Sequence, residues 1–242
     1  MSAFVLALNC GSSSVKLAVL DPASGRRALT GLAERVGTAE ASVRIDRDGE
    51  RSSATPDDAS HAGVVAALLA LMSDDERRSL VAVGHRVVHG GAAYSSSVLV
   101  DDAVRAELES LVPLAPLHLP GNLAGIDAAG AALPGLPQVA VFDTAFHRTM
   151  PDRAAQYAVP QAWRDDLGVR RYGFHGTSHR YVSEHAREVW FPDADDVRLV
   201  TLHLGNGCSA AAVANGVSLD TTMGFTPLEG LVMGSRSGDI DP

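Results

Sequence analysis

The chain has 242 residues, which is enough for one large or two ordinary domains with a sizeable buried core. Its 20 Lys and Arg against 29 Asp and Glu give a net charge of −9, which argues against nucleic-acid or anionic-membrane partners because these bind basic surfaces. Two cysteines form no disulfide framework, and no apolar run reaches the roughly 20 residues of a transmembrane helix. The N-terminus has no basic segment before its apolar run, so we expect a cytoplasmic protein.

Residues 5–20 predict a β-hairpin built to hold phosphate. Two apolar runs flank a turn at residues 11–14, and the run after the turn alternates like a half-buried strand. Backbone N–H groups of such a turn form an anion-binding concavity, the hydroxyls of Ser12 and Ser14 add donors, and Lys16 supplies a positive charge. A strand follows the turn, whereas a Walker loop is followed by a helix. Taken alone, the segment is equally compatible with a serine-rich turn and a solvated lysine.

The middle of the chain predicts strands alternating with helices, as in an α/β fold. We expect strands at 41–46, 81–89 and 138–142, a polar stretch at 47–60, and helices at 61–72, 101–111 and 122–132. The strand at 138–142 is expected to be short and fully buried, and it places Asp143 at its C-terminal end. Functional groups of α/β sheets gather at that end of the strands.

A polar link near residues 148–153 divides the chain, so we predict one α/β domain over residues 1–148 and the start of a second over 149–242. The second domain is expected to hold the segment 161–168, a helix near 178–190 and a hairpin at 199–213 around a Gly-rich turn. Two phosphate-type hairpins far apart in one chain suggest two related half-domains that face a nucleotide. No strand or helix closes the sequence after residue 237, so we expect an incomplete second lobe.

Seven motifs together resemble the acetate kinase family, in the family's order. They are NCGSSSVK at 9–16, GHRVVHGG at 84–91, PLHLPGN at 116–122, FDTAFH at 142–147, YGFHGTSH at 172–179, HLGNG at 203–207 and TMGFTPLEG at 222–230. The resemblance implies the actin and sugar-kinase type of two-lobed, ribonuclease H-like α/β fold. It also implies a homodimer for the longer chains of that family.

The resemblance implies direct in-line transfer of phosphate from ATP to acetate, giving ADP and acetyl phosphate reversibly, with Mg²⁺ as cofactor. The implied catalytic residues are Arg86, Asp143, His175 and Arg236. Acetate is already an anion at neutral pH, so the reaction needs positioning and charge neutralisation more than a base. Arginine forks suit both carboxylate and phosphate oxygens. We therefore favour an orienting role for Asp143 over its acid/base role in the family.

The resemblance also implies the residues that bind each substrate. For ATP they are Ser12, Ser14, Lys16, His203, Leu204, Gly205, Asn206 and Gly207; for the acid they are Arg86, Val88, Leu117, Phe174 and Pro227. Asn9 is the implied magnesium ligand, although one neutral amide is insufficient as a site by itself. Each apolar residue of the acid pocket, taken in isolation, is equally typical of a core.

Two alternatives to acetate phosphorylation stay open. One is a propionate or butyrate kinase of the same superfamily, because one methylene in a pocket changes affinity by only about 1 to 3 kcal/mol. The other is a nucleotide-binding relic without catalysis. The family's glutamate ligand to magnesium and its adenosine pocket have no counterpart in these 242 residues, so we expect the chain as printed to be inactive.

Overall fold

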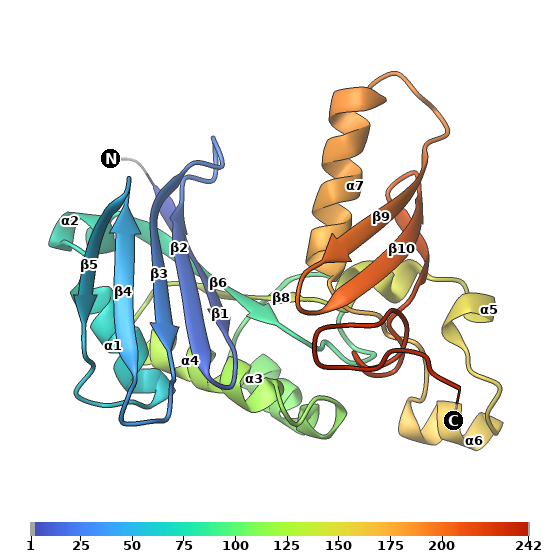
Figure 1. The fold of residues 1–242 in the computed structure, drawn as a ribbon, viewed down its shortest axis with the longest axis horizontal. Coiled ribbons are helices and arrows are strands. Elements are labelled where there is room, and N and C mark those ends of the chain that lie inside the picture. Colours follow the sequence, from blue (N-terminus) through green and yellow to red (C-terminus); the bar gives the residue numbers. More distant parts are fainter. Residues whose placement is uncertain (1–2, 242) are drawn as a thin grey trace. The chain divides into compact units, whose positions relative to one another are not determined.

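The computed structural model describes residues 3–241 and divides into two compact units (Figure 1). The first unit takes in the chain up to residue 87 together with 97–141. The second takes in 88–96 and the chain from residue 142 onward. The first predicted domain begins at residue 1 and the second ends at residue 242, and these two residues lie outside the described range.

The first unit is built on an eight-stranded sheet with the order β5-β4-β3-β2-β1-β6-β8-β7. Its strands are β1 (Phe4–Cys10), β2 (Ser14–Leu20), β3 (Arg27–Glu34), β4 (Ser42–Arg47), β5 (Glu50–Ala54), β6 (Leu80–Val87), β7 (Val98–Leu99) and β8 (Gln138–Phe142). The predicted first hairpin is confirmed, because β1 and β2 pair in antiparallel fashion. On its other side, β1 pairs with β6, which runs parallel to it.

Helices cover this sheet because its strands bury alternate apolar residues. Leu6 and Leu8 of β1 and Val15 and Leu17 of β2 belong to one buried cluster, which Leu68 of α1 also joins. The helices of the first unit are α1 (His61–Ala70), α2 (Asp74–Arg78), α3 (Asp102–Ser110) and α4 (Leu119–Ala132), with a short 3₁₀ turn, η1 (Val112–Leu114). Helices α1 and α4 pack on each other, and α4 packs on β1 and β6.

The predicted elements of this unit differ from the structure mainly at their ends. Helix α4 begins at Leu119 instead of 122, because Pro120 is compatible with a first helical turn. The polar stretch at 47–60 contains β5, an edge strand whose residues are all exposed and which therefore lacks an apolar pattern. Strand β6 ends at Val87 and buries alternate residues, and β8 is only partly buried.

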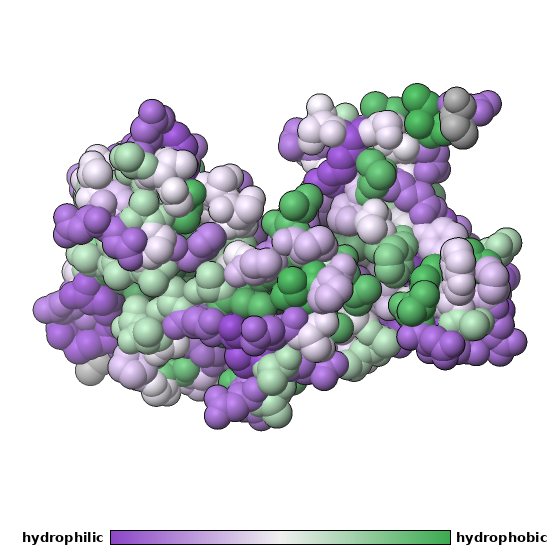
Figure 2. All heavy atoms as spheres, turned by 90° about the horizontal axis from the view of Figure 1, so that it is seen from below, coloured by the Kyte–Doolittle hydropathy of each residue, from purple (hydrophilic) through white to green (hydrophobic). Residues whose placement is uncertain are grey.

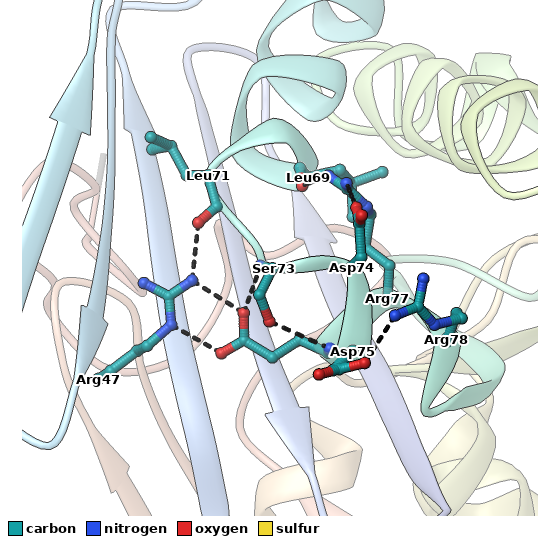
Figure 3. Close-up of polar contacts among 9 residues, drawn as sticks. Arg47, Leu69, Leu71, Ser73, Asp74, Asp75, Arg77 and Arg78 are labelled. Atoms are coloured by element: carbon teal, nitrogen blue, oxygen red, sulfur yellow. Dashed lines mark hydrogen bonds and ion pairs between the residues drawn. The ribbon is translucent and has the colours of Figure 1, made fainter.

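Short polar contacts fix the link between α1 and α2 to strand β4 (Figure 3). Arg47 of β4 donates from Nε and Nη2 to the two carboxylate oxygens of Glu76, at 2.6 and 2.8 Å, and also to the carbonyl of Leu71. Glu76 is in turn part of a capping box with Ser73 at the start of α2. The Arg47 guanidinium lowers the pKa of Glu76 to about 2.

The second unit contains a three-stranded antiparallel sheet with the order β11-β10-β9. Its elements are η2 (Ala145–Thr149), α5 (Asp152–Ala155), α6 (Gln161–Leu167), α7 (Gly176–Trp190), β9 (Arg198–Leu204), β10 (Cys208–Ala214) and β11 (Val217–Thr221). The predicted second hairpin is confirmed as β9 and β10. Helix α7 packs on β9, and η2 packs on both α7 and β11.

Hydrophobic residues reach the surface of the second unit at several separate places (Figure 2). Those of β9 are Val200, Leu202 and Leu204. Among residues 3–241, no helix combines the length and apolar composition that crossing a membrane requires.

Candidate active site

In the first unit, the turn between β1 and β2 presents polar groups to solvent. Gly11 N donates to the carbonyl of Ser14 at 2.8 Å and closes the turn. Ser12 and Lys16 are exposed, and Ser14 is half-buried. Lys16 lies opposite Asn9 in the register of the two strands, so the amide and the ammonium flank the same turn. The turn thus offers N–H, hydroxyl and ammonium donors, as an anion site requires.

Two side chains from helices hold the backbone of this turn. Asn122 Nδ2 of α4 donates to the carbonyl of Cys10 at 2.6 Å, and His61 Nε2 of α1 donates to the carbonyl of Gly11 at 2.8 Å. The turn is therefore fixed to two helices through the carbonyl groups of residues 10 and 11. Cys10 is buried beside this turn, and burial raises the pKa of its thiol to about 12.

Arg86 and Asn9 meet at the ends of two neighbouring strands. Leu8 of β1 pairs with His85 of the parallel strand β6, so the next residues along both strands lie side by side. Arg86 Nη1 donates to Asn9 Oδ1 at 3.3 Å, and Arg86 is exposed. The strand ends thus place a guanidinium next to the predicted phosphate turn.

The same contact limits the kind of magnesium site that Asn9 can join. Its amide oxygen already accepts from a guanidinium, and within residues 3–241 no group of three His, Cys, Asp or Glu is placed to hold a metal. These residues fit a Mg²⁺ that takes its other ligands from phosphate oxygens and water, and they do not fit a protein cage.

In the second unit, Asp143 and the start of α7 are joined. Asp143 follows β8 directly and is buried. Gly176 N donates to its carbonyl at 2.8 Å, and Thr177 Oγ1 lies 3.4 Å from its Oδ1. A side chain on Gly176 would collide with the Asp143 backbone, which explains a glycine there. The predicted strand end therefore delivers its carboxylate to the N-terminus of a helix.

His175 lies at the head of α7 in a left-handed conformation, with φ of 58°. This conformation is uncommon for a residue other than glycine and turns the side chain toward the β9–β10 turn. Its ring stacks on that of His203 with centroids 3.9 Å apart. A Cβ on Gly207 would lie 3.1 Å from its Nε2. The predicted site residue His175 thus lies against two predicted site residues of the β9–β10 turn, which is distant from it in sequence.

A series of side-chain hydrogen bonds that begins at His175 was not predicted as part of the site. The Nδ1 atom of His175 and the Nε2 atom of His179 each lie 2.8 Å from Ser209 Oγ. His179 Nδ1 lies 2.8 Å from Thr201 Oγ1. Burial lowers the pKa of His179 to about 4, so this ring is neutral near pH 7. The only sequence signal for Ser209 is its place two residues after the Gly-rich turn.

Arg236 lies in a loop that packs on the same turn. Its Nη1 donates to the carbonyl of Pro227 at 3.0 Å, and Gly234 N donates to the carbonyl of Asn206 at 3.0 Å. A Cβ on Gly207 would lie 3.8 Å from Arg236 Nη1. The structure therefore brings Arg236 together with the turn that also contacts His175.

The residues predicted for the acid pocket have mixed environments. Val88 and Phe174 of the second unit are buried and Pro227 is half-buried, while Leu117 of the first unit is 78% exposed. His89, also buried, packs edge-on against Tyr172 and Phe174 with ring centroids 4.5 and 5.8 Å away. Leu204 of the predicted ATP contacts is exposed.

The sequence model described as the acetokinase family matches residues 4–242. The chain belongs to this family. The acetate kinases of Deinococcus radiodurans and Deinococcus deserti are 54% and 55% identical to it over 240 residues, which are 99% and 98% of the chain and 60% of each relative. The chain thus spans about 60% of the length of the curated acetokinase family members that it matches.

Solved structures of the acetokinase family share this fold. A propionate kinase from Francisella tularensis has a TM-score of 0.94 at 44% identity, and the acetate kinase of Porphyromonas gingivalis one of 0.92 at 46%. Each match covers 99% of this chain and 62% of the solved chain. The predicted family and the predicted α/β fold class are confirmed.

Proposed function

We propose that this sequence supplies phosphate- and carboxylate-binding groups of an acetate kinase, which transfers the γ-phosphoryl group of ATP to acetate. The observation that carries the proposal is the match to the acetokinase family over residues 4–242. The local geometry of each unit supports it. A phosphate-type turn lies beside Arg86 in the first unit, and a second lies beside His175 and Arg236 in the second.

The second unit would stabilise the phosphoryl group in the transition state of its transfer. Its charge spreads over three equatorial oxygens, so fixed donors around it lower the barrier without covalent chemistry. Arg236 would supply a charged fork, and His175 Nε2 would donate one hydrogen bond. The backbone N–H groups of residues 205–207 would hold the nucleotide phosphates.

The first unit would bind the acceptor and further phosphate oxygens. Arg86 would hold the acetate carboxylate, and Lys16 with the Ser12 and Ser14 hydroxyls would hold phosphate. Mg²⁺, with Asn9 as its one protein ligand here, would neutralise phosphate charge. Asp143 of the second unit, which is bonded through its backbone to α7, would have an orienting role instead of removing a proton. As the resemblance implies, we propose a homodimer.

Propionate is the second candidate acceptor. A solved relative of 44% identity and TM-score 0.94 is named a propionate kinase. Val88 is buried two residues after Arg86 and is the side chain that we propose limits the length of the acid. Val88→Ala is expected to raise kcat/KM for propionate and butyrate relative to acetate, because the difference of a methylene is worth about 1 to 3 kcal/mol.

The test is a hydroxamate assay for acyl phosphate on the natural gene product that contains residues 1–242, with acetate, propionate and butyrate as acceptors. Arg86→Ala and Arg236→Ala should each lose about 3 to 5 kcal/mol of transition-state stabilisation. Arg198→Ala is the matched control, since Arg198 is exposed and its one ion pair within residues 3–241 is with Asp196. ATP binding without any acyl phosphate would support the non-catalytic alternative and overturn the proposal.

A further inference from the structure

A cavity of about 490 Å³ lies within the second unit and is lined by none of the residues proposed above for catalysis. Its walls come from α5, α6 and the segment 168–172, with Ala92 and Arg148 completing them. Both charged and apolar side chains line it. It is therefore a separate candidate for a binding site.

More positive than negative side chains line this cavity, and these side chains form no ion pairs among the described residues. Arg148, Arg164 and Arg170 line it together with two acidic residues, Asp152 and Asp165. Within residues 3–241, none of the five forms an ion pair, whereas Arg47 of the first unit is fully matched by Glu76. The two aspartates are exposed, so solvent screens them, while the three arginines are half-buried. The less hydrated part of the lining is therefore positive.

Arg148 is the least satisfied of these arginines. Its Nε and Nη1 atoms are buried and have no hydrogen-bond partner within the described residues. Buried charged donors left unpaired cost free energy, because they lose water and gain nothing in exchange. Arg170 shares this environment, since burial and the nearby charge of Arg148 both lower its pKa. An anion in the cavity would relieve both side chains.

We propose that this cavity binds a small oxyanion, either a phosphate or a carboxylate group, held by Arg148 and Arg170. Planar guanidinium groups donate pairs of charge-assisted hydrogen bonds to two oxygens of a carboxylate or of a phosphate. Arg164 also lines the cavity. One of its donors is already engaged, because its Nη1 donates to Gln156 Oε1 at 2.9 Å. Tyr172 lies at the cavity and three residues before His175, so an occupant contacts the segment that leads to the head of α7.

The experiment measures binding of inorganic phosphate and, separately, malonate to the purified chain by calorimetry and by thermal shift at constant ionic strength. Arg148→Gln and Arg170→Gln are expected to weaken binding about tenfold or more. Arg153→Gln is the control, because Arg153 is exposed on α5 and does not line the cavity. Phosphate bound at the proposed catalytic turns should be unaffected by all three changes.

Arg148→Gln also separates a lost site from a lost fold. Since the two orphaned donors of Arg148 cost free energy, this variant should unfold no earlier than the parent without anion, and should lose only the anion-dependent rise in Tm. Binding of phosphate or of malonate in this pattern supports the site and assigns its ligand class. Equal affinity in the parent and all three variants, or an equal loss in Arg153→Gln, would overturn it. The inference does not rest on the proposed function, because neither readout requires catalysis.

Discussion

The Ser209 hydroxyl lies between two histidine rings, so the ring to which it donates sets which nitrogen of His175 carries a proton. A hydroxyl has one hydrogen to donate, so if it donates to Nδ1 of His175, His179 must donate to it from Nε2. Thr201 then donates to Nδ1 of His179. In this arrangement His175 keeps its hydrogen on Nε2, which faces Gly207. That is the tautomer that the proposed phosphoryl contact needs.

Ser209→Ala tests this positioning role. With the hydroxyl removed, His175 loses the hydrogen bond at its Nδ1 atom, and kcat should fall about tenfold or more while KM changes little. The ¹⁵N chemical shifts of the His175 ring should change with it, which a purely structural role of Ser209 would not cause. Ser183→Ala is the control, because this buried hydroxyl contacts only the Arg180 carbonyl within α7. An unchanged tautomer and rate would contradict the role.

Three buried histidines make the second unit sensitive to acid. Burial lowers the pKa of His89, His147 and His179 to about 4, below the ordinary value of 6.5. Between these values the unfolded chain binds protons that the folded chain does not, so stability is lost as pH falls from 6.5 toward 4. The expected slope of the unfolding free energy is up to about 1.4 kcal/mol per pH unit for each histidine.

Tryptophan fluorescence measures this effect in the second unit alone, because Trp163 and Trp190, the chain's two tryptophans, both belong to it. Urea unfolding at pH 7, 6 and 5 should show a falling midpoint. His89→Leu should lessen the slope by about one proton, whereas the exposed His185→Gln should not change it. A midpoint independent of pH over this range would show that these rings are protonated in the folded protein.

Sequence motifs led to the residues proposed to contact ligands, and they did not lead to the residues that support them. Asn9, Arg86 and His175 stand inside recognisable motifs. By contrast, His61 contributes one hydrogen bond to a turn, and Ser209 contacts two histidine rings. Such contacts depend on how distant segments pack, and a lone histidine or serine carries no periodic pattern from which they could be predicted.

At the scale of elements, the close approach of α4 to the first hairpin depends on glycine. A Cβ on Gly125 would lie 2.7 Å from Cys10 Cβ and nearer still to its sulfur, and one on Gly121 would lie 2.9 Å from the Gly11 carbonyl oxygen. Helix α4 can therefore hold the phosphate turn only with small residues on that face. Helix propensity alone would favour alanine at both positions.

Gly125→Ala and Gly130→Ala form a matched pair on α4. A Cβ on Gly130 meets no atom within 4 Å, so Gly130→Ala should stabilise the chain by up to about 1 kcal/mol through helix propensity. Gly125→Ala should destabilise it by about 1 to 3 kcal/mol, because overpacking exceeds that gain. Denaturant unfolding followed by circular dichroism measures both. Equal effects of the two changes would mean that α4 does not approach β1 this closely.

Periodic patterns predicted several of the buried elements but missed β3, which buries alternate residues, and they failed for two exposed elements of the first unit. The alternation in β2 and the apolar spacing of α1 match their observed burial. Strand β5 has no buried residue, and helix α2, which the sequence did not predict, has none either. These two elements depend on pairing with β4 and on the capping box at Ser73, which leave no apolar signature.

At the scale of the whole molecule, each unit contains three successive antiparallel strands around a phosphate-type turn. In the first unit they are β1, β2 and β3, and in the second they are β9, β10 and β11. This repeated motif agrees with the predicted internal duplication. In the first unit the sheet continues beyond β1 through the parallel strand β6, whereas β9 is an edge strand among the described residues.

That edge strand leads to a prediction for the chain of 242 residues. Val200, Leu202 and Leu204 alternate along β9 and are 74%, 55% and 71% exposed. An exposed apolar face on an edge strand, whose outer side is unpaired, is a template for association. We therefore expect the purified chain to self-associate with increasing concentration, as light scattering coupled to size-exclusion chromatography would show.

Leu202→Lys should weaken association about tenfold or more, because charge is costly to bury in such a contact. Leu99→Lys, which changes an equally exposed leucine of the first unit, should leave it unchanged. A chain that stays monomeric at high concentration would show that β9 is protected by means other than pairing.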